Sequence, residues 1–245
     1  MWWSPEALSL DARPPFGLRR DDLIVKDVAP TVLREHLDTY AAWQAGRQAA
    51  IAAGRTPSMA VMTATEWAVS GIGDRGSGEI GEIGAIEVAI ETAARVEDRP
   101  GGARFGTLVH ALLASMPLVS REASLARLAE AHGRVLGATA DEVRAASAAA
   151  ERVWLHPVLR DAARASDAGL CYRETPVTWR LGEERIVEGT VDLAYVAGDV
   201  VVVVDFKTDR ELDGALETYR RQVQIYAAAV GSVLGRRARG ILMRV

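Results

Sequence analysis

Residues 200–209, VVVVVDFKTD, decide the fold, because five valines run directly into Asp205, Phe206 and Lys207. An uninterrupted run of β-branched residues is typical of a strand that is buried on both faces. Because strand side chains alternate, Asp205 and Lys207 are expected on one face at the end of that strand. Such an ending indicates either a structural ion pair at the surface or a site that uses both charges.

The lysine in this stretch is unusual for the chain. Of the 29 basic residues, only Lys26 and Lys207 are lysines, and arginine supplies every other cation. Lysine offers a compact point charge with rotatable donors, which the planar guanidinium of arginine cannot imitate. Lys207 is therefore expected to have a role of its own.

The segments around this strand predict an α/β fold with a mixed sheet flanked by helices. Strands are expected at 170–181, 185–196, 200–208 and 238–245, the first three joined by short glycine-containing turns. Helices are expected at 31–55, 104–116, 122–135, 139–153, 156–165 and 214–234, and residues 59–69 read as a strand followed by a turn of helix.

Two glycine-containing stretches suggest a division of the chain. Residues 70–84, SGIGDRGSGEIGEIG, contain six glycines and are expected to form a flexible linker. A second boundary is expected at Pro100, which two glycines follow. We therefore predict a linker or junction segment over 1–99 and a folded domain over 100–245, with a helical insert at about 119–168.

Composition excludes several classes of protein. The chain has 245 residues, 49% of them hydrophobic, which suits a globular core, and no apolar run is long enough to span a membrane. The N-terminus lacks the pattern of a signal peptide, so a cytoplasmic protein is expected. One cysteine, Cys171, excludes an internal disulfide and a four-cysteine cluster. The sequence has no phosphate-binding GxxxxGK[ST] loop, and its net charge of −4 is not that of a strongly basic nucleic-acid binder.

A second carboxylate is expected close to Asp205. If strands 185–196 and 200–208 pair through their short turn, Asp192 comes to lie near Asp205. Two carboxylates at adjacent strands repel each other unless a cation neutralises them, and hard oxygen ligands suit Mg²⁺ or Mn²⁺. Taken singly, His110 on an apolar helix also reads as a core histidine, and Gln222 and Tyr226 read as solvated helix surface.

The order of these residues resembles the RecB-type branch of the PD-(D/E)XK nucleases. The matching motifs are GxxxH at 106–110, GxxD at 189–192, DxK at 205–207 and QxxxY at 222–226. The flanking segments are similar to those of AddA-like, UvrD-type helicase–nucleases, in which the nuclease is the C-terminal module. The chain has no helicase motor of its own, so the resemblance implies a fragment, a truncated relative or a protein that works with a separate helicase.

The resemblance implies a set of roles around one divalent cation. His110, Asp192 and Asp205 would ligate Mg²⁺ or Mn²⁺, and the backbone carbonyl of Phe206 would complete the shell. Lys207, with Asp192 and Asp205, would be catalytic, holding the attacking water. The implied reaction is hydrolysis of DNA phosphodiester bonds, of an exonuclease type, on single strands that a helicase supplies during double-strand-break repair.

The remaining candidates would surround this centre. Gln222, Tyr226 and Tyr219 would brace the site or contact DNA. Glu174 stands where related proteins often carry a strand glutamate, but an exposed strand position explains it as well. Two other functions stay open: a non-catalytic module that binds DNA or a helicase while retaining the fold, and an RNA-directed or restriction-type enzyme of the same fold.

Overall fold

The computed structural model describes residues 28–70, 83–93, 100–119, 125–208 and 214–245. The helices are α1 (Pro30–Arg55), α2 (Ala64–Ser70), α4 (Ala103–Ser115), α5 (Leu125–Leu136), α6 (Ala140–Trp154), α7 (Pro157–Asp167) and α8 (Leu216–Leu234). The strands are β1 (Ala60–Thr63), β2 (Val88–Thr92), β3 (Cys171–Leu181), β4 (Arg185–Ala197), β5 (Val200–Lys207) and β6 (Arg237–Arg244). The chain divides into two compact units, residues 1–57 and 58–245, which are described separately.

Helix α1 is the element described in the first unit. It begins with Pro30 at a position where a proline is tolerated, and it buries none of its residues. Leu37, Tyr40 and Trp43 are each more than half exposed, so these apolar side chains of the helix predicted at 31–55 are not covered within this unit.

A six-stranded mixed sheet forms the centre of the second unit. Its strand order is β1-β4-β5-β6-β2, and β3 pairs with β4. The β3–β4 and β4–β5 pairs are antiparallel hairpins, whereas β1–β4, β5–β6 and β2–β6 are parallel. Gly182 and Gly198 take positive φ angles in the two hairpin turns, as tight turns require. The sheet confirms the α/β fold expected from the sequence.

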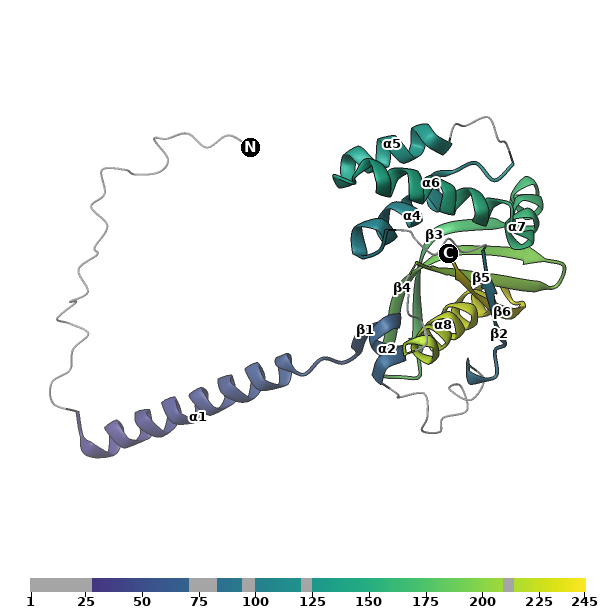
Figure 1. Ribbon diagram of the computed structural model, residues 1–245. Coiled ribbons are helices and arrows are strands. Elements are labelled where there is room, and N and C mark those ends of the chain that lie inside the picture. Colours follow the sequence, from purple (N-terminus) through teal and green to yellow (C-terminus); the bar gives the residue numbers. More distant parts are fainter. Residues whose placement is uncertain (1–27, 71–82, 94–99, 120–124, 209–213) are drawn as a thin grey trace, which may run out of the picture. The chain divides into compact units, whose positions relative to one another are not determined.

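Helices cover both faces of this sheet (Figure 1). Helices α4 to α7 pack on one face, where Val202 and Val204 of β5 point. Helices α2 and α8 pack on the other face, where Val203 points. The valine run is therefore buried on both sides, as its composition predicts, and it holds the end of β5 rigidly. Among the described residues, no helix is both long and apolar enough to cross a membrane.

The sheet extends across the boundary expected at residue 100. Strand β1 pairs with β4 at 185–188, and β2 pairs with β6 at 240–244, so both belong to the same sheet as the C-terminal strands. The compact units instead divide after Pro57. Strand β2 was not expected, and most of the glycine-rich stretch 70–84 lies outside the described residues.

Candidate functional site

The paired part of the β4–β5 hairpin ends just before Asp192 and Asp205. The paired register runs from Ala197↔Val200 to Leu193↔Val204, and one further step places Asp192 opposite Asp205. At this step the Asp192 side chain bonds the neighbouring strand: its Oδ2 accepts the backbone N–H of Phe206 at 2.8 Å. One carboxylate oxygen thus anchors β5, and the other is left for the site.

The β3–β4 hairpin is distorted at the same level. Its register passes from Arg173↔Leu193 to Thr175↔Val191 without a pair between Glu174 and Asp192. Glu174 has a φ of 45°, the left-handed region that a glutamate seldom adopts.

The distortion reverses the faces of β4. Val191 packs in the cluster with α2 and α8, whereas Leu193, two residues on, packs in the cluster with α4 to α7. In a regular strand these two side chains would share a face. Because of this reversal, the Asp192 side chain lies toward α4 while Val191 and Leu193 both stay buried. The Glu174 carboxylate lies beside Asp192.

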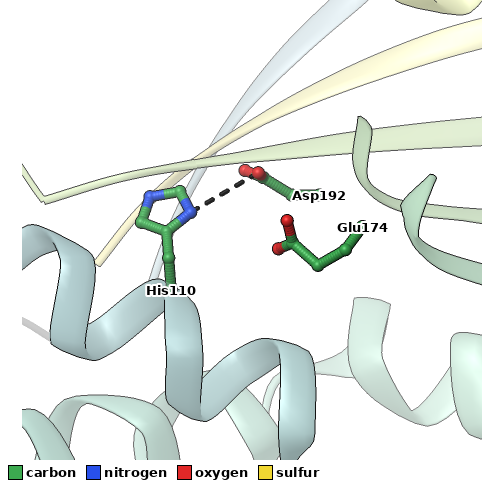
Figure 2. A group of neighbouring side chains, drawn as sticks. All are labelled: His110, Glu174 and Asp192. Carbon is green, nitrogen blue, oxygen red and sulfur yellow. Dashed lines mark ion pairs between the residues drawn. The ribbon is translucent and has the colours of Figure 1, made fainter. Parts of the chain in front are cut away.

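Helix α4 brings His110 to these two carboxylates (Figure 2). Nδ1 of His110 lies 3.4 Å from Oδ1 of Asp192. One ligand atom from each of His110, Glu174 and Asp192 lies within 4.8 Å of the other two. Gly106 permits this approach of α4, because a Cβ there would lie only 2.9 Å from the hydroxyl of Thr208, just beyond β5.

The charges of these residues act on one another. Burial alone would lower the pKa of His110, but the hydrogen bond and charge of Asp192, with the charge of Asp205, raise it above its ordinary value. Burial and the Asp192 charge raise the pKa of Glu174. Burial also raises the pKa of Asp205, to about 6, although Lys207 acts in the opposite direction. The negative charges of these carboxylates are therefore only partly compensated, and a bound cation would compensate them further.

Asp205 and Lys207 form a buried ion pair beside this group. Nζ of Lys207 lies 2.8 Å from Oδ2 of Asp205, and the two side chains are only 16% and 6% exposed. The same Nζ lies over the ring of Tyr219 on α8, 4.7 Å from its centroid, in a cation–π contact. The pair is therefore not the exposed structural ion pair considered from the sequence. A buried ion pair adds little net stability, so stability alone does not explain it.

Helix α8 places Gln222 and Tyr226 against the strands. Both residues are buried, and Nε2 of Gln222 lies 3.4 Å from the Tyr226 hydroxyl. The Tyr226 ring lies against Gly189 of β4, where a Cβ would be 2.5 Å from that hydroxyl. The glycine of the GxxD motif thus makes room for the tyrosine of the QxxxY motif, and neither Gln222 nor Tyr226 is the solvated surface residue considered from the sequence.

Replacing Gly189 with alanine is expected to lower the free energy of unfolding by about 1–3 kcal/mol, because the new methyl group overlaps the buried Tyr226 ring. Urea unfolding of the wild type and the variant measures the difference. Gly84→Ala is the matched control in the same unit, since no atom lies within 4 Å of a Cβ at that glycine. Equal unfolding free energies for Gly189→Ala and the wild type would contradict the close packing.

The structure brings the predicted residues to one end of the sheet in two groups. His110 and Asp192 lie in the three-residue cluster, whereas Asp205 pairs with Lys207 and is not part of that cluster. Glu174 lies in the cluster, although the sequence analysis considered an exposed strand position as an equal explanation for it and did not include it among the metal ligands. The turn at 182–184 would have predicted that Glu174 lies close to Asp192, because the two residues are equally far from the centre of this turn.

The donor set of the cluster fits a divalent cation. One imidazole nitrogen and two carboxylate groups converge. Carboxylate oxygens suit hard divalent cations, and imidazole is a common ligand of transition-metal ions. The mutual repulsion of Glu174 and Asp192 in the metal-free protein would be relieved by such an ion. His110, Glu174 and Asp192 could therefore hold a metal, with Asp205 next to them.

Comparison with known proteins gives two findings. The model of the PD-(D/E)XK nuclease superfamily matches residues 88–244. A stretch of 62 residues is 42% identical to an ATP-dependent helicase/nuclease subunit of Desulforudis audaxviator (strain MP104C), covering 23% of this chain and 5% of that relative. The chain therefore spans only a small part of the length of this relative.

Proposed function

Because the chain belongs to the PD-(D/E)XK nuclease superfamily, we propose that it is a divalent-metal-dependent deoxyribonuclease that cleaves single-stranded DNA. The observation that carries the proposal is the convergence of His110, Glu174 and Asp192 beside the buried Asp205–Lys207 pair. A buried ion pair adds little to stability, so its place beside a cluster that could bind a metal is better explained by a role in phosphodiester hydrolysis.

Each residue of the site has a distinct part in this proposal. His110, Asp192 and Asp205 would hold Mg²⁺ or Mn²⁺ together with the carbonyl of Phe206, and Glu174 would be a fourth side chain at the ion. When bound, the cation supplies electrostatic stabilisation of the charge that develops on the phosphate.

Lys207 holds the attacking water, with Asp205 and Tyr219 fixing its ammonium group. The burial of Gln222 and Tyr226 supports a bracing role for these two residues rather than direct contact with DNA.

A helicase is the proposed partner. The relative that matches 62 residues is named as a subunit of an ATP-dependent helicase/nuclease. We propose that a helicase motor supplies single strands to the site, and that the nuclease acts as an exonuclease in the cytoplasm during double-strand-break repair.

The proposal is tested by cleavage of end-labelled single-stranded and duplex DNA by the purified full chain. We expect degradation of the single strand in Mg²⁺ or Mn²⁺, none in EDTA, and none with Asp205→Ala. A folded wild type that cuts neither substrate in either metal rejects the proposal. In that case, retention of labelled DNA in a gel-shift assay would support the non-catalytic binding module.

Glu174→Gln is expected to weaken Mn²⁺ binding by at least about 10-fold, the smallest usual effect of losing even an outer-shell partner, because it removes one anionic group from the cluster. The metal-free variant should be no less stable than the wild type, since repulsion between Glu174 and Asp192 is lost. Isothermal titration with Mn²⁺ and thermal unfolding measure the two effects. Glu188→Gln, an exposed position on β4, is the matched control. Equal affinity for Glu174→Gln and the wild type would remove Glu174 from the site.

A further inference from the structure

Helix α2 lies outside the family match at 88–244, yet it contacts the helix that braces the site. Nε2 of Gln222 donates to Oγ1 of Thr65 at 3.0 Å, and the same nitrogen lies 3.4 Å from the Tyr226 hydroxyl. Gln222 is 8% exposed, and its carboxamide lies between the hydroxyl of the exposed Thr65 and that of the buried Tyr226. Its orientation therefore depends on a residue that precedes the recognised nuclease segment.

The orientation of Gln222 bears on the strand that carries Asp192. Tyr226 stands one helical turn after Gln222, and its ring lies against the backbone of Gly189. Gly189 and Asp192 belong to the same strand, β4, just before the point where that strand reverses its faces. A shift of the Tyr226 ring would displace this part of β4, because the gap left by the glycine is already filled.

Thr65 is itself fixed with respect to β4. Thr63 and Glu66 form reciprocal hydrogen bonds at the start of α2, with the Thr63 N–H donating to Glu66 at 2.8 Å and the Glu66 N–H donating to Thr63 Oγ1 at 3.1 Å. Strand β1, which ends at Thr63, pairs with β4 so that Thr63 lies beside Glu188, the neighbour of Gly189.

The buried Trp67 anchors α2 in the cluster that contains Tyr226. Strand β4 therefore contacts this group of residues twice. It pairs with β1, which leads directly into Thr65 of α2, and its Gly189 packs against Tyr226, which Gln222 connects to Thr65.

We propose that Thr65 is a positioning residue for the nuclease site, acting through Gln222 and Tyr226 on the stretch of β4 that holds Asp192. The inference rests on the proposed function where it is tested by the rate of DNA cleavage. It is tested a second time by Mn²⁺ affinity, which requires no catalysis. If Thr65 has this role, the segment from β1 to α2 contributes to nuclease activity and is more than the junction predicted from the sequence.

Thr65→Val keeps the shape of the side chain and removes the hydroxyl. We expect about a 10-fold fall in kcat for single-stranded DNA, the lower end of the effect of losing an outer-shell partner, with an unchanged KM. Mn²⁺ binding should weaken by about the same factor. Thr65→Ser restores the hydroxyl and should restore both. Thr39→Val is the matched control, because the Thr39 hydroxyl donates to the backbone carbonyl of Glu35 within α1, and it should change neither value.

A double-mutant cycle separates positioning from general packing. If Thr65 acts through Gln222, Thr65→Val should cause no further loss of kcat or Mn²⁺ affinity in a Gln222→Ala background. Additive losses, or a Thr65→Val variant equal to the wild type in both quantities, overturn the positioning role. All measurements are made well below the thermal unfolding midpoint of each variant, so that a less stable variant is still compared in its folded state.

The two proposals fail in different ways. A wild type that binds Mn²⁺ but does not cut DNA contradicts the nuclease function, and the Mn²⁺ affinities of Thr65→Val and Thr65→Ser then decide the positioning role. A wild type that cuts DNA, with a Thr65→Val variant of equal kcat and Mn²⁺ affinity, upholds the nuclease and overturns the role of Thr65.

Discussion

Replacing Lys207 with methionine is expected to lower the rate of metal-dependent DNA cleavage by about 100–1,000-fold. Methionine keeps an unbranched apolar stem of similar length but removes the ammonium group that lies 2.8 Å from Asp205 and over the ring of Tyr219. The expected loss is that of one preorganised donor in a buried site. Initial rates on labelled single-stranded DNA, at saturating metal, measure the effect.

Arginine at the same position should restore little of this activity. The guanidinium is planar and larger, and the pocket between Asp205 and the Tyr219 ring holds a compact ammonium. Arg144→Met, which removes an exposed cation from α6, is the control and should keep full activity. A Lys207→Met variant that cuts DNA within about threefold of the wild-type rate would make Lys207 a structural partner of Asp205 only, since a catalytic donor is worth far more than that.

Local patterns were sufficient to predict the central strands and the helices around them. The valine run, the two short turns and the helix after Lys207 all depend on residues close in sequence. The paired register of β4 and β5 ends at Leu193↔Val204, and extending it by one step places Asp192 opposite Asp205. Glycine turns fix hairpin registers, and buried strands have a composition of their own, so both features can be recognised without a structure.

The reversal of strand faces at Glu174 and Asp192 could not be predicted in this way. Sequence patterns assume a regular alternation along each strand, and a left-handed glutamate carries no signal of the kind that glycine or asparagine would give. Unusual backbone conformations of this sort persist where the surrounding structure holds them, and they concentrate at functional sites. Glu174 stays an exposed residue of β3, and the distortion places its carboxylate beside His110 and Asp192.

Long-range pairing explains the remaining differences. Strand β2 pairs with β6 near the other end of the sequence, and β1 pairs with β4 across the whole helical insert. Neither partner can be read from the segment itself, so the sequence analysis placed a boundary at residue 100, although β1 and β2, which precede it, belong to the same sheet as the C-terminal strands. The alternation of Ile86, Val88 and Ile90 is the local signal that would have indicated β2 as a strand.

Replacing Asp192 with asparagine is expected to abolish detectable cleavage, with a loss of at least about 1,000-fold, because the site loses a charge that holds the cation. Mn²⁺ affinity should fall by at least about 100-fold, beyond the usual effect of an outer-shell change. Isothermal titration and the cleavage assay measure the two losses. Thr190→Val, an exposed change on the same strand, is the control for both.

The stability of this variant separates the two oxygens of Asp192. Asparagine retains a carbonyl oxygen that can accept the Phe206 N–H, so the unfolding free energy should change by less than about 1 kcal/mol. Asp192→Ala leaves that N–H without its acceptor and should cost about 1–3 kcal/mol. Both variants are expected to be inactive, but only alanine should be less stable. An asparagine variant as unstable as the alanine variant would mean that the charge of Asp192 holds β5 in place, and the separation between anchoring and metal binding would then be wrong.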